Sequence, residues 1–176
     1  MDRLQAHIRD LADELGCVIQ HSPRFTGMMY VEEKPLRLEC LPVTDLRSYY
    51  INLHELGHVA HNHTQGRPPY TNKTFYFKNG VLRSEAEAWA WAFDHAKEPL
   101  PPDVAYNLGQ ESLLSYYHHA YLVGFTTFGY HWGTPTKDLS NGNRHWHPFA
   151  YGEPDDLFWS VLARFSPKLV SMRPRA

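Results

Sequence analysis

The feature that most constrains this chain is a five-residue motif, His54-Glu55-Leu56-Gly57-His58. Its two histidines are four residues apart, so a helix would place them on one face, about one turn from each other. Both imidazoles could then bind one metal ion, and Zn²⁺ commonly takes such a pair. Glu55 is too close to His54 to be a comfortable third ligand, but it can accept a proton from a metal-bound water. The motif therefore predicts a zinc site with a general base beside it.

The residues around the motif have the spacing of an amphipathic helix. Thr44 or Asp45 can cap the N-terminus of this helix. Its apolar stripe comprises Tyr49, Leu53, Leu56 and Ala60. The helix should end before the turn-forming residues 66–69, and residues 64–80 are predicted to be a loop. This helical context favours a metal site over two solvent-exposed histidines.

A catalytic zinc site needs a third protein ligand and one open position. The metzincin pattern would place a histidine six residues after His58, and that residue is Thr64, so the pattern is excluded. His61 and His63 are two further candidates close to the motif. His61 lies roughly 10 Å along the helix axis from His54, so one ion would have to bond three side chains of one straight helix. Both histidines are therefore minor candidates.

An acidic residue on a second helix is the preferred third ligand. The sequence predicts this Ala- and Trp-rich helix over residues 84–97, beginning with Ser84-Glu85-Ala86-Glu87. If Ser84 caps the helix, Glu87 completes a Ser-x-x-Glu capping box, which leaves Glu85 for the metal. The two carboxylates point about 200° apart on a helix, so they do not share one ion. Glu85 is the predicted ligand and Glu87 the alternative. If neither binds a metal, both would be solvent-exposed acids that stabilise the first turn of the helix through its dipole.

The remaining segments predict a single α+β domain over residues 1–176. Apolar residues at helical spacing predict a first helix over residues 2–15, with Gly16 as its stop. Three short apolar runs follow, and we expect them to form an antiparallel β-meander packed on the helical core that carries the motif. These runs lie at residues 17–19, 28–31 and 36–40.

The second half of the chain is predicted to be helical at both ends. A helical region is predicted over about residues 103–123 and ends by residue 124. Residues 125–153 are rich in Gly, His, Pro and aromatic residues, and we expect an ordered loop because the aromatic side chains need burial. Residues 154–156 then open a last amphipathic helix, so residues 125–176 combine this loop with a terminal helix.

Charge and composition limit the kinds of partner. The formal net charge is −2, which offers no basic patch for nucleic acid and no attraction to an anionic membrane surface. No apolar segment suits a signal sequence or a membrane span, so we expect a cytoplasmic protein. Cys17 and Cys40 lack metal-site spacing and are interpreted as buried thiols rather than a disulfide. The sequence does not specify an oligomeric state.

Together, the two motifs resemble those of the ImmA/IrrE-type zinc metallopeptidases. The resemblance rests on His54-Glu55-Leu56-Gly57-His58 and Glu85-Ala86-Glu87-Ala88, with 26 residues between them. It covers roughly residues 1–98. It implies a zincin-like, gluzincin-like fold and endopeptidase activity on a protein substrate, often a regulator. By residue, it implies His54, His58 and Glu85 as zinc ligands and Glu55 as the base.

Two positions depart from the pattern of this family. Trp89 stands four residues after Glu85, where the family usually has Asn or Asp, and an indole cannot accept a hydrogen bond. Asn62 stands four residues after His58, where a histidine typically follows. A zinc peptidase also needs a donor for the developing oxyanion. Eight downstream side chains are eligible: Tyr116, Tyr117, His118, His119, Tyr130, His131, His145 and His147.

The sequence thus predicts a zinc-dependent endopeptidase that acts on a protein or peptide substrate. The alternative is a non-catalytic, zinc-containing binding or regulatory module, which the His-rich segment 118–147 and Trp89 motivate. A fourth protein ligand, such as His61 or His63, would favour this alternative because it would close the metal site. A nucleic-acid-associated protein is disfavoured by the charge balance.

Overall fold

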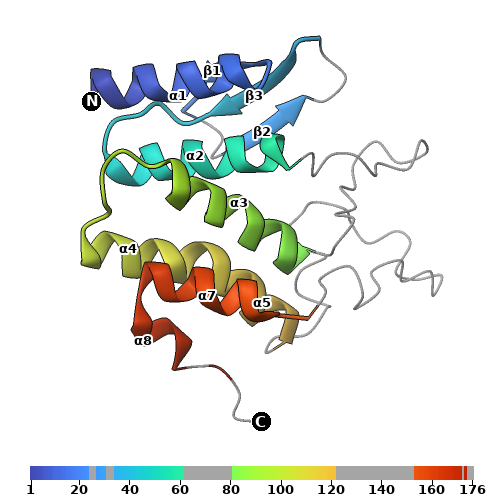
Figure 1. Cartoon of the computed structure of the whole chain (residues 1–176), viewed down its shortest axis with the longest axis vertical. Coiled ribbons are helices and arrows are strands. Elements are labelled where there is room, and N and C mark those ends of the chain that lie inside the picture. The colour runs from blue at the N-terminus through green and yellow to red at the C-terminus, as the bar shows by residue number, and fades with distance from the viewer. Residues whose placement is uncertain (24–26, 31–33, 62–80, 122–152, 172, 174–176) are drawn as a thin grey trace, which may run out of the picture.

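The computed structural model describes residues 1–23, 27–30, 34–61, 81–121, 153–171 and 173. Its helices and strands follow one another in the order shown in Figure 1. They are α1 (Asp2–Glu14), β1 (Cys17–His21), β2 (Gly27–Tyr30), β3 (Leu36–Cys40), α2 (Leu46–Ala60), α3 (Val81–His95), α4 (Pro102–Gly109), the π-helical turn η1 (Gln110–Leu114), α5 (Ser115–Tyr121), α7 (Asp156–Phe165) and α8 (Pro167–Val170). This mixture of helices and strands confirms the predicted α+β class.

Helix α3 lies in the middle of the molecule (Figure 1). It packs against α2 on one side and against α7 on the other. Helix α1 and the sheet pack against α2, and α4 packs against α7. One buried apolar cluster runs through these layers, from Leu4 and Ile8 on α1 to Leu162 and Phe165 on α7. Helix α3 is therefore an interior element with a packed neighbour on each side.

Within the described residues the sheet has three strands in the order β1-β3-β2, so the predicted antiparallel meander is wrong. Strand β1 pairs with β3 in parallel, with Ile19 opposite Leu38, and β2 pairs with β3 in antiparallel fashion, with Met29 opposite Leu38. Alternating polarity predicts which face of a strand is buried, but it does not specify the neighbouring strand. Leu38 and Cys40 are fully buried, and the strand that carries them takes the central position.

Local signals correctly predicted the stop of α1 and the starts of α2 and α7. Gly16 follows α1 with φ of 68°, a left-handed conformation that glycine adopts without strain. Asp45, rather than Thr44, caps α2: its carboxylate accepts a hydrogen bond from the backbone N–H of Ser48 at 2.7 Å. The Ser48 hydroxyl accepts one in return from the backbone N–H of Asp45 at 3.0 Å. Asp155 caps α7 through its side chain, which confirms the predicted start of the terminal helix.

The helical region predicted over residues 103–123 is made of α4, η1 and α5. The π-helical turn at Gln110–Leu114 and the short helix α8 are not foreseen by the sequence pattern. The predicted loop over residues 64–80, and all but the last residue of that over residues 125–153, lie outside the described residues. No helix in the described part of the chain is both long and apolar enough to cross a membrane.

The two cysteines are buried, free thiols, as predicted. Cys17 lies opposite Leu36, and Cys40 lies opposite His21, so they are offset by four residues on neighbouring strands. That offset corresponds to roughly 13 Å, whereas a disulfide requires Cα atoms closer than about 7 Å. Burial raises the pKa of Cys17 to about 11 and raises that of Cys40 as well, which keeps both thiols protonated and unreactive.

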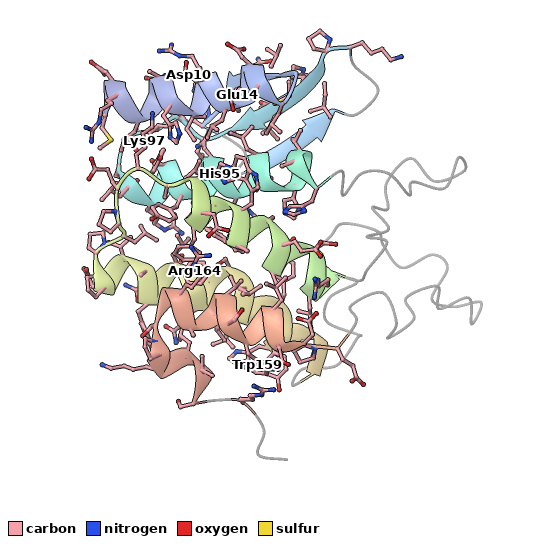
Figure 2. The ribbon with its side chains drawn as sticks, viewed as in Figure 1. Asp10, Glu14, His95, Lys97, Trp159 and Arg164 are labelled. Carbon is pink, nitrogen blue, oxygen red and sulfur yellow. The ribbon has the colours of Figure 1, made fainter. Side chains whose placement is uncertain are left out.

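A buried histidine joins α1 to α2 and to the chain that follows α3. Nδ1 of His7 is 2.8 Å from the hydroxyl of Tyr49, which accepts a hydrogen bond from the backbone N–H of Lys97 at 3.0 Å. Burial is the main cause of a lowered pKa at His7. Lys97 and His95 lower this pKa further, and Asp10 and Glu14 raise it; Figure 2 labels all four of these charged residues.

We expect His7 to make the fold sensitive to acid. A lowered pKa means that the unfolded chain takes up the proton first, so the stabilisation is complete above the ordinary value of 6.5 and is lost as the pH falls through the lower folded value. His7→Gln should therefore flatten the dependence of the free energy of unfolding on pH between about pH 7.5 and pH 5.5, measured by urea denaturation. Parallel curves for the variant and the wild type would contradict this expectation.

Candidate metal centre

Helices α2 and α3 come into close contact at Gly57. A Cβ atom added to Gly57 would lie 2.5 Å from the carbonyl oxygen of Ala88 and 2.8 Å from its Cα. The contacted atoms belong to the backbone of α3, so they cannot move aside as the end of a side chain could. The glycine of the motif therefore permits the short separation between the two helices that carry the candidate ligands.

Three side chains from these helices converge: His54 and His58 from α2, and Glu85 from α3. One ligand atom of each lies within 4.8 Å of the other two. Nε2 of His54 is 3.0 Å from Oε2 of Glu85, and Nε2 of His58 is 3.6 Å from Oε1 of Glu85. Two ligand atoms of a tetrahedral zinc ion, each about 2.1 Å from the metal, are roughly 3.4 Å apart. The donor types and their spacing therefore fit a metal ion.

The three donors are shielded from solvent. The side chains of His54, His58 and Glu85 are 10%, 9% and 5% exposed. Burial lowers the pKa of His54, but the nearby carboxylates of Glu55 and Glu85, the second of which is hydrogen-bonded to the ring, outweigh burial and raise this pKa to about 9. The raised pKa favours a proton on His54 when no metal is bound. A metal ion that binds here competes with that proton for the imidazole.

Glu55 lies beside the group rather than in it. Its Oε1 is 3.5 Å from Nδ1 of His54, whereas Nε2 of the same ring faces Glu85. The Glu55 side chain is 17% exposed, which is more than any of the three donors. The site thus has two parts, a converging set of two histidines and one glutamate, and a more accessible carboxylate next to it.

The geometry brings Glu85 into the group and directs Glu87 elsewhere, but the capping argument that separated them is wrong. Helix α3 begins three residues before Ser84, which lies inside the helix and is 1% exposed. The apolar side chain of Leu82 is fully buried, and its packing extends the helix beyond the predicted start. Oε1 of Glu87 accepts a hydrogen bond from Nε of Arg83 at 2.7 Å.

Among the described residues, the remaining ligand candidate, His61, is not in the group. His61 is the C-cap residue of α2 and is exposed to solvent. It lies outside the set of His, Cys, Asp and Glu side chains that converge within the described residues. His63 and Thr64 are not among the residues that the structure describes.

Three of the eight candidates for an oxyanion donor have described side chains: Tyr116, Tyr117 and His118. The ring of Tyr117 packs against Phe158 and Trp159 of α7, with centroid distances of 5.9 and 5.4 Å. Tyr117 is therefore part of the core between α5 and α7. The other five candidates lie outside the described side chains.

A contact between Trp89 and the group is absent from the predictions. Trp89 belongs to the core and is 1% exposed. Its indole, however, also stacks on the imidazole of His54, with centroids 4.3 Å apart and ring planes 20° apart. The sequence carried a signal for this contact, because Trp89 is one helical turn after the predicted ligand Glu85 and lies on the same face of α3.

Comparisons of the chain with protein-family models, curated proteins and solved structures gave no match. The buried group of His54, His58 and Glu85 is the observation on which a function can be built. Chemically, two imidazoles and a carboxylate at this spacing can hold a divalent metal ion, and Glu55 can exchange a proton beside it.

We expect Gly57→Ala to destabilise the protein. An ordinary helical glycine replaced by alanine stabilises a helix by about 1 kcal/mol. Here the new methyl group would lie 2.5 Å from the Ala88 carbonyl oxygen and would push the helices apart. The expected net loss is about 1–3 kcal/mol, measured as a lower thermal midpoint. Ala88→Gly should not rescue the variant, because the contacted atoms are backbone atoms, and a raised midpoint for Gly57→Ala would contradict the close contact.

Glu85→Gln and Glu87→Gln form a matched pair on one helix. Changes to residues that merely orient metal ligands already weaken metal binding by about 10- to 100-fold, so loss of the Glu85 carboxylate should cost at least as much. Glu87→Gln should leave the affinity unchanged, because its carboxylate bonds Arg83. Competition with a chromophoric chelator measures both dissociation constants. Equal losses in the two variants would exclude Glu85 as the specific ligand.

Proposed function

We propose that this chain is a zinc-dependent endopeptidase with a zincin-like fold, of the ImmA/IrrE type, that hydrolyses a protein substrate. The observation that carries the proposal is the convergence of His54, His58 and Glu85, with Glu55 beside them. Two histidines, a glutamate ligand and an adjacent glutamate base are the protein groups that a zinc peptidase uses at its metal. The resemblance of the two motifs to that family supports the same function.

The donor set favours zinc over the common hard cations. Imidazole nitrogens suit zinc, whereas Mg²⁺ and Ca²⁺ prefer oxygen ligands. His54 and His58 would hold the ion through Nε2, the atom that faces Glu85 in each ring, and Glu85 would hold it through its carboxylate. When bound, zinc supplies a Lewis acid that polarises a peptide carbonyl and lowers the pKa of water.

Glu55 would carry out the proton transfers. Its Oε1 faces Nδ1 of His54, which leaves Oε2 to accept a proton from the attacking water. The water oxygen forms a bond to the peptide carbonyl carbon, and the C–N bond then breaks. Glu55 returns the proton to the leaving amine nitrogen, so the carboxylate ends the reaction unprotonated, as it began. The partial exposure of its side chain suits a group that must reach a water molecule.

The decisive variant is Glu55→Gln, which keeps the size of the side chain but cannot take up a proton. We expect the wild type to bind one equivalent of zinc and to cleave unfolded proteins such as casein. Glu55→Gln should keep the zinc and lose cleavage by about 100- to 10,000-fold, because general-base catalysis contributes that much. Metal analysis and mass spectrometry of the cleavage products measure the two properties separately.

Glu111→Gln is the control for this experiment, because Glu111 is exposed and pairs with Arg47 away from the group. It should keep both zinc and cleavage. Wild-type zinc binding with equal cleavage by the wild type and Glu55→Gln would overturn the mechanism. Zinc binding without any cleavage would favour the alternative, a non-catalytic binding or regulatory module, to which the near-complete burial of the three donors is also suited.

A further inference from the structure

Four rings form a continuous column that ends at the metal centre. Phe165 of α7 contacts Trp89 of α3 edge to face, with centroids 4.9 Å apart and planes 71° apart. Trp89 stacks on His54 at 4.3 Å, and His54 meets the ring of His58 edge to face at 4.5 Å. We call these four residues the aromatic column. It connects helix α3 with its two packed neighbours, α7 and α2.

The aromatic column restricts the orientation of the His54 ring plane. The torsion between the Cβ and the ring of a histidine is broad, so the backbone does not by itself fix the ring plane. Metal sites usually fix it by a hydrogen bond from the second ring nitrogen to an acceptor such as a carboxylate or a carbonyl oxygen. In this chain Oε1 of Glu55 lies 3.5 Å from Nδ1 of His54, which is long for such a bond.

Trp89 supplies a different constraint on the same ring. Its indole offers a face and one N–H donor but no acceptor, so it cannot receive a hydrogen bond from His54. The 20° angle between the two rings instead confines the imidazole to a plane parallel to the indole. Trp89 is itself 1% exposed, and the edge of Phe165 supports it at 4.9 Å, so the supporting surface is held in place.

The buried indole N–H of Trp89 indicates that the ring of this side chain, rather than its hydrogen-bonding group, is what the site uses. Nε1 of Trp89 is buried and has no hydrogen-bond partner within the part of the chain that the structure describes. An unsatisfied buried donor is unfavourable, and an apolar side chain of similar size would avoid this cost. The flat ring is therefore the property that the site gains from tryptophan at position 89.

We propose that Trp89 is the positioning residue of the metal centre: by stacking on His54 it holds Nε2 toward Glu85, and through Phe165 it makes helix α7 a part of the site. This inference rests on the metal centre of the proposed function. It extends the site beyond residues 1–98, the segment that carries the family resemblance, because α7 is formed by Asp156–Phe165. It also explains how the chain manages without an acceptor at position 89.

The test compares Trp89→Leu, which removes the ring, with Trp89→Phe, which keeps one. Binding of Zn²⁺ alone is measured by chelator competition, and the visible spectrum of the Co²⁺-loaded protein reports the ligand geometry. Trp89→Leu should bind Zn²⁺ about 10- to 100-fold more weakly, because the residue that orients the ligand His54 is lost. The absorption bands of its Co²⁺-loaded form should also shift. Trp89→Phe should recover most of the affinity and the wild-type bands.

Trp91→Leu is the matched control. Trp91 lies on the same helix and also stacks on a histidine, His95, with centroids 3.8 Å apart and planes 17° apart. It is not in the aromatic column, so its loss should leave the Zn²⁺ affinity and the Co²⁺ spectrum unchanged. Phe158→Leu, a core change on α7 outside the column, corrects for general destabilisation, which is followed through the thermal midpoint of each variant.

The outcomes separate this inference from the proposed function. Trp89→Leu with wild-type affinity and spectrum would overturn the role of Trp89 while leaving the metal centre intact. Phe158→Leu with the same loss as Trp89→Leu would also overturn it, because the effect would then follow from destabilisation. Metal binding that depends on Trp89 in a protein without peptidase activity would support the inference and overturn the proposed function. A wild type that binds neither Zn²⁺ nor Co²⁺ would overturn both.

Discussion

The backbone contact at Gly57 and Ala88 controls the distance between helices α2 and α3, and the candidate site is built across that distance. The distance between two helix axes limits how closely their facing side chains can approach each other. Small residues at the contact permit a short interaxial distance. The 3.0 Å approach of His54 to Glu85 follows from this contact, because the two residues lie within one turn of it on either helix. The glycine of the motif is thus as much a part of the site as the histidines.

Burial gives the converging group its chemical character. Charged groups are costly to remove from water, and the cost is offset only when each has close partners of opposite charge. His54 meets this condition with Glu85 at one ring nitrogen and Glu55 near the other. Trp89 covers the ring face, so the imidazole is confined on its edges by carboxylates and on its face by an indole. A divalent cation that binds here would compete with a proton for the same imidazole.

Helical periodicity and capping residues were enough to predict most helices and the shared face of His54 and His58 on α2. These features depend on residues within four positions of one another, which a single sequence displays. The choice of Glu85 over Glu87 rested on a capping box that the structure does not contain. The strand order was not predictable, because it depends on which strands meet in space. The early start of α3 at Val81 depends on the burial of Leu82. The stack of Trp89 on His54 depends on a contact across 35 sequence positions.

The interior position of α3 has a consequence for the way the molecule unfolds. A helix with packed neighbours on both sides cannot detach without exposing the layers on either side of it. Glu85 is carried by that helix, so the packing on both sides opposes a local opening that would separate it from the two histidines, whereas a ligand on a surface loop lacks such packing. An ion held in this way raises global stability by mass action, by an amount that grows with its concentration relative to its dissociation constant.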